Sequence, residues 1–282
     1  MSKQIVYVSG LPRSGSTLLC QLLGEHPEIY STAHSSPLCA QIERTRQGLS
    51  HDAFMLSQLD VDFDTGYARI KRSLKAFMDA WHDETDLPVA VDKSRQWLPE
   101  IETLMELDPN FKMVICIRDL VDVFASVEKK HRKTILMSFP DNMAPGNIEV
   151  RCKTLFAPQG IIGGPISAIK NLGDVTNQFI ADHIYFVAYE ALIEQPVKTM
   201  RGIYEWIGVD RFNIDPDNLT VNPHESDSYY HFKYPHKTYD KIFKNTKYEV
   251  SQRMINLIIK EHMWYYQMYY PITAKEFTQG QK

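Results

Sequence analysis

The sequence predicts a single α/β domain, residues 1–282, built in three layers with a central parallel sheet between two layers of helices. Two observations predict this fold class. Four short apolar segments are typical of strands buried on both faces, and each precedes a segment whose apolar residues recur at helical spacing. The 282 residues are 44% hydrophobic, which is enough to build one sizeable core.

The first half of the chain contributes two strand–helix pairs. The run Ile-Val-Tyr-Val-Ser at residues 5–9 is rich in β-branched residues and stops at Gly-Leu-Pro. A helix is expected at residues 16–23, because apolar residues recur there until Pro27 ends the pattern. The second strand is expected at residues 88–92, followed by an amphipathic helix at residues 97–107.

Two further pairs follow in the second half. Residues 113–117 are apolar throughout and lead into a helical pattern at residues 120–131. Residues 183–188 predict the fourth strand. The helix after it is expected at residues 196–207, with proline at its first position and Gly208 as its stop.

The segment between the third and fourth strands has a different composition. Residues 137–165 are rich in proline and glycine, which predicts a long loop over the site rather than a linker, because core-like elements follow it. Residues 166–180 then predict a helix. No internal repeat or low-complexity stretch is visible in the sequence.

Charge and cysteine usage narrow the function classes. The 31 Lys and Arg against 35 Asp and Glu give a net charge of −4, which argues against a nucleic-acid partner. The four cysteines form no CxxC pair, so we expect reduced thiols and no metal site. No stretch approaches the length of a membrane span, and the N-terminus lacks a signal-peptide core, so a cytoplasmic protein is expected.

A glycine loop joins the first strand to the first helix. Gly10-Leu-Pro-Arg-Ser-Gly15-Ser-Thr17 has the GxxxxG spacing that lets backbone N–H groups face a phosphate at a helix N-terminus. Clusters of this composition also form plain turns. The loop has Ser16 where a Walker motif has lysine, and its cation is Arg13, which disfavours a magnesium-dependent nucleoside triphosphatase.

A second anion position follows the third strand. Arg118 comes directly after that strand, and Ser126 lies about two helical turns further on. A guanidinium offers paired donors to a phosphate, and ligands of open α/β sheets gather where strands end. The alternatives are an Arg118–Asp119 pair that caps a helix and a serine on a helix surface. Together with the loop, these residues predict a ligand with two separated phosphate-like groups.

These motifs resemble the sulfotransferase family, whose donor is 3′-phosphoadenosine 5′-phosphosulfate. The glycine loop is similar to that of the tyrosylprotein sulfotransferase branch, in which arginine replaces the lysine of many cytosolic members. The resemblance continues through Asp92-Lys93-Ser94, Ile117-Arg118-Asp119 and Tyr189-Glu190, over roughly residues 5–208. It implies a three-layer fold like that of the P-loop NTPases and transfer of a sulfuryl group.

The resemblance also implies roles for individual residues. Arg13 would contact the transferring group, while Arg118 and Ser126 would bind the 3′-phosphate. His34 occupies the position of the glutamate base in the tyrosylprotein branch, and a histidine is the base in cytosolic members, so we expect His34 to be the base and leave the tyrosylprotein substrate open. The remaining implied positions are Ser14, Gly15, Ser16 and Thr17 around the 5′-phosphate, Lys93 near the reacting oxygens, and Tyr189 and Lys237 near the donor.

Several alternatives stay open at this point. A P-loop nucleotide or nucleoside kinase that uses ATP is one, and a nucleotide-binding protein without turnover is another. Residues 137–182 are expected to form a lid over the acceptor, and residues 229–282 to close over the nucleotide. The acceptor is a small molecule, a lipid, a glycan or a peptide, and a homo-oligomer is possible.

Overall fold

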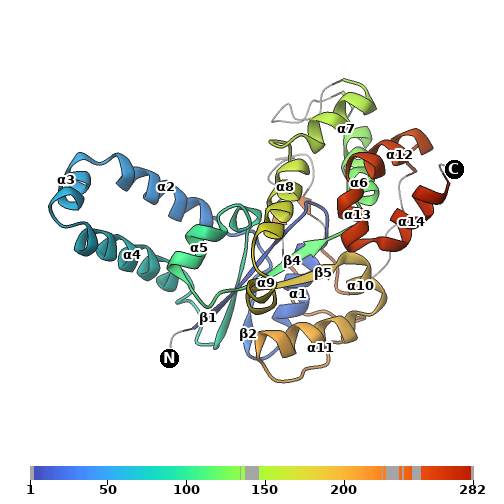
Figure 1. Ribbon diagram of the computed structural model, residues 1–282. Coiled ribbons are helices and arrows are strands. Elements are labelled where there is room, and N and C mark those ends of the chain that lie inside the picture. The colour runs from blue at the N-terminus through green and yellow to red at the C-terminus, as the bar shows by residue number, and fades with distance from the viewer. Residues whose placement is uncertain are drawn as a thin grey trace.

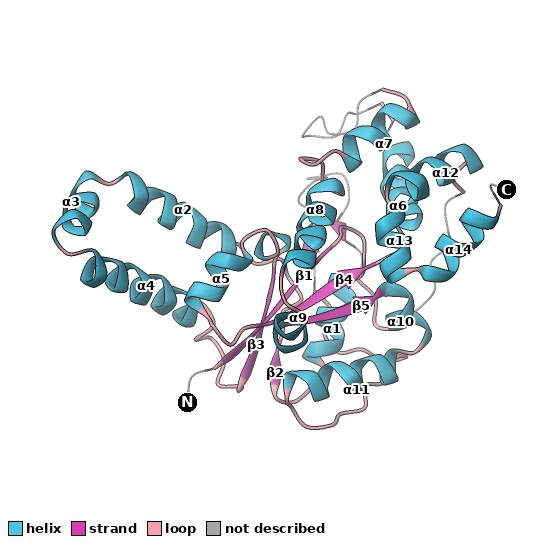
Figure 2. Ribbon diagram, in the orientation of Figure 1, coloured by secondary structure: helices cyan, strands magenta, loops and turns pink. Residues whose placement is uncertain are grey.

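A five-stranded parallel sheet forms the centre of the computed structural model (Figures 1 and 2). The structure describes residues 3–133, 135–136, 146–223, 225–226, 235–236, 238–242 and 249–280. The strand order is β2-β3-β1-β4-β5. The bounds of the strands are β1 (Gln4–Gly10), β2 (Ile29–Tyr30), β3 (Val89–Lys93), β4 (Lys112–Ile117) and β5 (Ile184–Ala188). The predicted fold class is therefore confirmed.

The central strand β1 pairs with β3 on one side and β4 on the other, with Val8 opposite Lys93 and Val114. Successive residues of β1 point to opposite faces of the sheet. Tyr7 belongs to one core cluster and Val8 to the other, so both faces of the sheet are covered. This burial explains why the strands are continuous apolar runs.

Three helices cover one face of the sheet, and most of the others lie against the second face or beyond its edges. The first group is α1 (Ser16–Gly24), α10 (Tyr189–Glu194) and α11 (Pro196–Ile207). The second group includes α5 (Ile101–Leu107), α6 (Leu120–Lys133), α7 (Ile148–Phe156), α8 (Gly163–Asn171), α9 (Asn177–His183), α12 (Gln252–Glu261), α13 (Met263–Tyr269) and α14 (Pro271–Gln279). A short antiparallel pair joins β6 (Glu225–Ser226) to β7 (Pro235–His236).

Three helices between β2 and β3 form an arm that extends away from the sheet, on the left of Figure 1. They are α2 (Leu38–His51), α3 (Ala53–Val61) and α4 (Phe63–Ala80). Asp52 and Asp62 cap α3 and α4 by accepting hydrogen bonds from backbone N–H groups three residues later. No element is predicted in this region from the sequence.

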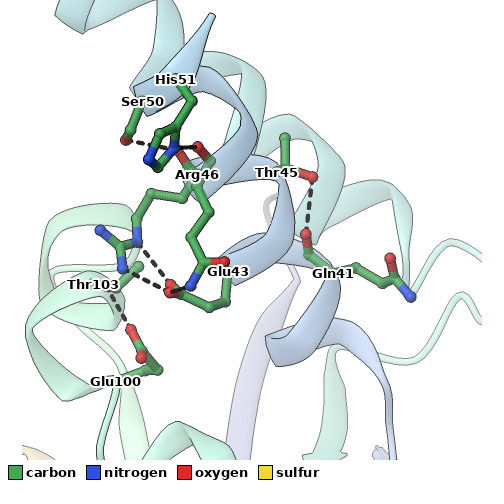
Figure 3. A network of polar contacts seen from close by, with 9 residues as sticks. Gln41, Glu43, Thr45, Arg46, Ser50, His51, Glu100 and Thr103 are labelled. Carbon is green, nitrogen blue, oxygen red and sulfur yellow. Dashed lines mark hydrogen bonds and ion pairs between the residues drawn. The ribbon is translucent and has the colours of Figure 1, made fainter.

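Side-chain hydrogen bonds along the helix reinforce α2, as Figure 3 shows. Arg46 donates two hydrogen bonds to Glu43, at 2.7 and 2.8 Å, and Gln47 donates a third to the same carboxylate at 2.6 Å. The bonds from Arg46 lower the pKa of Glu43. Neighbours three and four residues apart on a helix stabilise it in this way.

Two predicted helices are broken in the structure. The segment expected as one helix at residues 97–107 is a 3₁₀ turn (Arg95–Trp97) followed by α5. The segment expected as a helix at residues 166–180 is α8, a 3₁₀ turn (Leu172–Asp174) and α9. Thr176 caps α9 by accepting a hydrogen bond from the N–H of Phe179 at 3.1 Å, so a new helix begins there.

The expectation of one long loop at residues 137–165 is wrong for its described part. That part contains α7 and the first residues of α8. Glycines let these helices approach, because a Cβ on Gly163 would lie 2.0 Å from the carbonyl oxygen of Ala157 and one on Gly160 would lie 2.4 Å from that of Leu155. Glycine here serves a tight helix–helix turn.

The structure describes the environment of all four cysteines. All four cysteines are buried and none forms a disulfide, and burial raises the pKa of the Cys152 thiol to about 12. Thiols of this kind are inert, small core residues. Within the described ranges, every helix is too short or too polar to cross a membrane.

Candidate functional site

The carboxyl ends of the five strands meet at one edge of the sheet, and each strand ends at, or is followed by, a residue that was predicted to belong to the site. Ligands of open α/β sheets bind at this edge. From one side of the sheet to the other, these residues are His34 after β2, Lys93 at the end of β3, Arg13 after β1, Arg118 after β4 and Tyr189 after β5.

The glycine loop takes its shape from three left-handed backbone positions. Gly10 has a φ of 126°, and a Cβ there would lie 2.2 Å from the carbonyl oxygen of Cys116 in β4. Arg13 adopts a φ of 60°, which is uncommon for a residue with a side chain. Gly15, with a φ of 87°, immediately precedes α1. The loop therefore delivers the chain to the N-terminus of α1, where backbone N–H groups lack helical partners.

Two of the four loop residues expected around a phosphate, Ser14 and Thr17, form hydrogen bonds that hold the loop. The buried Ser14 hydroxyl donates to the carbonyl oxygen of Leu11 at 2.6 Å and closes the turn. Thr17 is also buried and accepts a hydrogen bond from Lys93. Ser16 is the first residue of α1 and is half-buried.

Arg13 connects the glycine loop with α6. Its Nε donates to the hydroxyl of Ser126 at 3.2 Å. Arg118 donates from Nη1 to the carbonyl oxygen of Arg13 at 2.9 Å. The structure thus brings together the loop cation and both residues of the second predicted anion position, which are more than 100 residues away from it in sequence.

Tyr189 lies under the guanidinium of Arg118, with 4.2 Å between the guanidinium carbon and the ring centroid. A cation over an aromatic face is attracted by the ring. The same ring closes the space beside Gly15, because a Cβ on that glycine would lie 2.6 Å from it. Tyr189 therefore fixes Arg118 and the glycine loop relative to each other.

Lys93 and His34 are neighbours at the β3 end of this edge. The buried Nζ of Lys93 donates to Thr17 Oγ1 at 3.1 Å and to the carbonyl oxygen of Ala33 at 2.7 Å. Ala33 has a φ of 56°, and the next residue, His34, is exposed. The backbone N–H of Ser36 donates to the carbonyl oxygen of Lys93 at 2.8 Å and ties this segment to β3.

The C-terminal helices supply contacts that the sequence analysis missed. Three tyrosine hydroxyls of residues 265–270 bond to the residues that follow β4 and β5. Burial raises the pKa of all three phenols, and it also raises the pKa of Asp119. The bonds are Tyr265 to the carbonyl oxygen of Arg118 at 3.0 Å, Tyr266 to Asp119 at 3.3 Å and Tyr270 to Glu190 at 2.9 Å.

A signal for these contacts was present in the sequence. The cluster Trp264-Tyr265-Tyr266 stands out, but its spacing is equally typical of core. Tyr265 and Tyr266 are fully buried, so they are core residues. Their hydroxyls bond to Arg118 and Asp119 and so help to position these two residues.

Two predictions reach beyond the described residues. Lys237 lies outside them, so its predicted place near the donor stays a prediction. The expected lid is described from residue 146 to residue 182. In the described part of the chain, no three His, Cys, Asp or Glu side chains lie close enough to hold a metal ion.

The chain is similar to known proteins over most of its length. The model of the sulfotransferase family matches residues 5–213. No curated protein gives a significant match. Among solved structures, the sulfotransferase domain from the curacin biosynthetic pathway is 19% identical, with 77% of this chain and 76% of that chain covered and a TM-score of 0.48.

Two further solved structures give similar values. The sulfotransferase domain of the olefin synthase from Synechococcus PCC 7002 is 22% identical over 84% of this chain and 85% of that one, with a TM-score of 0.46. The sulfotransferase from Alicyclobacillus acidocaldarius is 15% identical over 76% of this chain and 85% of that one, with a TM-score of 0.47.

Proposed function

From the premise that this chain belongs to the sulfotransferase family, we propose that it moves a sulfuryl group from 3′-phosphoadenosine 5′-phosphosulfate to an acceptor hydroxyl or amine. One observation carries the proposal. Lys93, Arg13 and Arg118 stand at the ends of three adjacent strands, β3, β1 and β4, on the ligand-binding edge of the sheet. Three cations on one edge suit a donor that carries two phosphates and a sulfate.

The 3′-phosphate belongs beside Arg118 and Ser126 in this proposal. Arg118 donates a hydrogen bond from Nη1 to the carbonyl oxygen of Arg13. Its buried Nε has no hydrogen-bond partner within the described part of the chain. A buried donor without a partner is costly, and a phosphate oxygen supplies the acceptor that is missing. The residues present therefore fit this group of the donor.

The 5′-phosphosulfate belongs at the glycine loop. Ser16 and Thr17 begin α1, whose N-terminal N–H groups favour an anion, and Arg13 adds a full positive charge. Tyr189 closes the loop on the side of Arg118. The donor thus spans from the loop to Arg118 and supplies an activated sulfuryl group when it is bound.

His34 serves as the general base. Its exposed side chain follows Ala33, whose carbonyl oxygen accepts from Lys93, so the imidazole belongs to the segment nearest the Lys93 ammonium. The acceptor oxygen or nitrogen forms a bond to sulfur while the bond from sulfur to the bridging oxygen of the 5′-phosphate breaks. A ring nitrogen of His34 takes the acceptor proton, and the bridging oxygen keeps the electron pair.

Lys93 and Arg13 stabilise the negative charge that develops on the leaving phosphate. Sulfuryl transfer has demands like those of phosphoryl transfer, in which positioning and fixed charge supply most of the catalysis. Lys93 is held by Thr17 and Ala33, so its charge is placed before the donor binds. The products are a sulfated acceptor and 3′-phosphoadenosine 5′-phosphate.

A transfer assay with radiolabelled donor and a library of alcohols, amines, glycans, lipids and peptides tests the proposal. We expect His34→Ala to lower kcat by about 10²–10⁴-fold with the donor saturating, because it removes the base. The matched control is His51→Ala, an exposed histidine of α2 whose loss should leave kcat unchanged. Normal turnover by His34→Ala would remove His34 from the mechanism.

Thermal shift separates this function from an ATP-dependent kinase. A ligand at about 100 times its Kd stabilises the native state by about 2.7 kcal/mol. We expect 3′-phosphoadenosine 5′-phosphate to raise the Tm and ATP with magnesium to raise it far less. The opposite order would support the kinase.

The proposal extends to the acceptor and to location. The acceptor would enter beside the described part of the expected lid, which contains α7, α8 and most of α9. We place the enzyme in a reducing compartment such as the cytoplasm, because its four cysteines are buried and none forms a disulfide.

A further inference from the structure

We propose that Asp92 is a positioning residue for Lys93, the cation that ends β3, and this inference rests on the role of Lys93 in the proposed function. Asp92 is fully buried and directly precedes Lys93 in the strand. Its carboxyl oxygen Oδ1 accepts a hydrogen bond from the indole Nε1 of Trp97 at 2.6 Å. Trp97 is fully buried as well, so water does not compete for this bond.

Asp92 and Lys93 point to opposite faces of the sheet, because they are successive residues of a strand. Lys93 pairs with Val8 of β1 and donates to Thr17 on the face that α1 covers. Asp92 pairs with Tyr7 of β1, which belongs to the core cluster of the other face. Asp92 therefore acts on Lys93 through the backbone that they share.

The hydrogen bond between Asp92 and Trp97 closes the turn that follows β3. The backbone N–H of Ser94 donates to the carbonyl oxygen of Val8 at 3.0 Å. The ring of Trp97 meets that of Tyr7 edge-on, with 5.0 Å between their centroids. The residue before Lys93 is thus bonded to a packed indole, and the residue after it is bonded to β1. Together these contacts fix the backbone from which the Lys93 side chain leaves the sheet.

The second carboxyl oxygen of Asp92 indicates a role beyond stability. This Oδ2 lies 3.4 Å from Nε2 of the buried His82, and neither atom has a hydrogen-bond partner among the described residues. Buried polar atoms without partners lower the stability of a fold and are rare in native proteins. Proteins retain such costs mainly at functional sites. Here the cost falls on the residue next to the cation that the proposed mechanism requires.

Asp108 provides the matched control for Asp92. Its carboxyl group accepts a hydrogen bond from the hydroxyl of Tyr7 at 3.2 Å, and it is half-buried at the end of α5. It shortly precedes β4, whose first residue lies at the opposite edge of the sheet from Lys93. Asp108→Ala therefore removes a comparable bond on the same face of the sheet without touching the turn after β3.

Acetylation of lysine amines in the full chain by a water-soluble N-hydroxysuccinimide ester, quantified by peptide mass spectrometry, tests the position of Lys93 without any enzyme activity. We expect Asp92→Ala and Trp97→Phe each to speed the labelling of Lys93 about fivefold, because the loss of one hydrogen bond favours local opening to that extent. Asp108→Ala should leave it unchanged. The labelling of Lys112 should be equal in all four proteins, and circular dichroism checks their fold.

Steady-state transfer with saturating donor tests the consequence for catalysis. We expect Asp92→Ala and Trp97→Phe to lower kcat by about tenfold or more, because a small displacement of a catalytic group is costly. Their Kd for 3′-phosphoadenosine 5′-phosphate should stay normal, since Arg118 and the glycine loop are unchanged. Asp92→Asn should restore both kcat and the slow labelling of Lys93. Its amide oxygen still accepts from Trp97, and its amide nitrogen donates to Nε2 of His82.

A double variant tests whether Asp92 acts through Lys93. Asp92→Ala added to Lys93→Met should lower kcat no further, because residues that act as a unit are not additive. A further loss, unchanged labelling of Lys93 in both Asp92→Ala and Trp97→Phe, or an Asp92→Asn as impaired as Asp92→Ala would each overturn the inference. Faster labelling with a normal kcat would instead uphold the positioning of Lys93 by Asp92 and refute the role of Lys93 in the proposed function.

Discussion

Lys93 is a buried cation that joins three segments of the sheet edge. It donates to Thr17 in α1 and to Ala33 beside His34, and it ends β3. We expect Lys93→Met to lower kcat by about 10²–10³-fold, because one fixed charge aimed at the leaving group is lost. Steady-state transfer with saturating donor measures this.

The matched control for Lys93→Met is Lys112→Met. Lys112 begins β4 and therefore lies at the opposite edge of the sheet, where it stands 4.6 Å from the ring of Trp206. The kcat of Lys112→Met should therefore equal that of the unmodified protein. Urea unfolding of both variants separates lost catalysis from lost folding. An equal loss of kcat in the two variants would contradict a role of the Lys93 charge in stabilising the leaving group.

Position 15 requires glycine for two reasons, its backbone conformation and the lack of space for a side chain. Its φ of 87° is unfavourable for alanine, and a Cβ would meet the ring of Tyr189 at 2.6 Å. We expect Gly15→Ala to lower the free energy of unfolding by about 1–3 kcal/mol. Chemical denaturation measures this change.

Gly48 provides the comparison for Gly15. It lies within α2, and a Cβ there would meet nothing within 4 Å. Gly48→Ala should raise the free energy of unfolding by about 0.5–1 kcal/mol, because alanine favours the helix. A neutral Gly15→Ala would contradict the packing of Tyr189 against the loop.

The sequence predicted residue positions better than residue contacts. Arg13 and Arg118 were placed correctly at strand ends, because a strand followed by a loop is visible in the pattern of residues. Their shared contact through the carbonyl oxygen of Arg13 was not foreseen. It depends on the left-handed backbone of Arg13 and on tertiary packing, neither of which has a local signal. The roles of these residues stay predictions.

At the scale of elements, a buried ion pair fastens α7 to α6. Arg151 donates to Glu128 at 2.5 and 2.9 Å, and both side chains are buried. Burial alone raises the pKa of Glu128, but the hydrogen bonds and charge of Arg151 outweigh it, so the pKa lies below its ordinary value. Ser126 is two residues away on α6, so this pair also fixes α7 near the donor site.

This pair makes stability depend on pH in a defined direction. Because the folded-state pKa of Glu128 is lowered, its contribution is complete above the ordinary glutamate pKa of about 4.3 and is lost as pH falls through the folded value. We expect Glu128→Gln to cost on the order of 3 kcal/mol at neutral pH and to flatten the fall in stability below about pH 5. Urea unfolding at several pH values measures both effects.

Glu149→Gln is the control for that experiment. Glu149 lies on α7 and pairs with Lys153 and Arg253 at the surface, so its loss should change stability little. If Glu128→Gln and Glu149→Gln had the same free energy of unfolding at every pH, the pair of Arg151 and Glu128 would not stabilise the packing of α7 on α6.

Elements with a strong period were predictable, and elements made by tertiary contacts were not. The four apolar strands were found, whereas the two-residue strand β2 is too short to show a period. Helix α3 was missed because it buries none of its residues, so its apolar residues form no core-facing stripe. Helix α4 was missed although it buries Leu74 and Met78 in the core. Helix α7 was missed because the glycines around it suggested a loop.

At the scale of the whole molecule, the C-terminal helices complete a site that is formed mainly by the first two thirds of the chain. Helix α13 lies beyond the segment matched by the family model, and Tyr265 bonds to the backbone of Arg118. Tyr266 bonds to Asp119, the next residue. The segment that matches the family model therefore contains the candidate site residues, while part of their support comes from helix α13, outside that segment.

We expect Tyr266→Phe to lower the free energy of unfolding by about 1–3 kcal/mol, because Asp119 loses the hydroxyl donor. It should also weaken binding of 3′-phosphoadenosine 5′-phosphate more than binding of adenosine 5′-phosphate, since Arg118 is adjacent. Denaturation and calorimetry measure the two effects. Tyr269→Phe is the control, because Tyr269 is a half-buried residue of the same helix whose hydroxyl forms no hydrogen bond to the strand ends within the described residues. Equal effects of the two variants would contradict the supporting role of Tyr266.

The net charge of −4 describes the whole molecule but not its candidate site. It predicts no global attraction to polyanions, but the average conceals three cations at one edge of the sheet. Local charge at strand ends, rather than the overall balance, is what suits a doubly phosphorylated donor.

Calorimetric titration tests the central claim, that Arg118 and the glycine loop bind the two ends of one nucleotide. Unmodified protein should bind 3′-phosphoadenosine 5′-phosphate at least about tenfold more tightly than adenosine 5′-phosphate, because charged hydrogen bonds to the 3′-phosphate are gained. Arg118→Ala should remove that preference, and Arg201→Ala, at a surface arginine of α11, should keep it. An undiminished preference in Arg118→Ala would contradict the account.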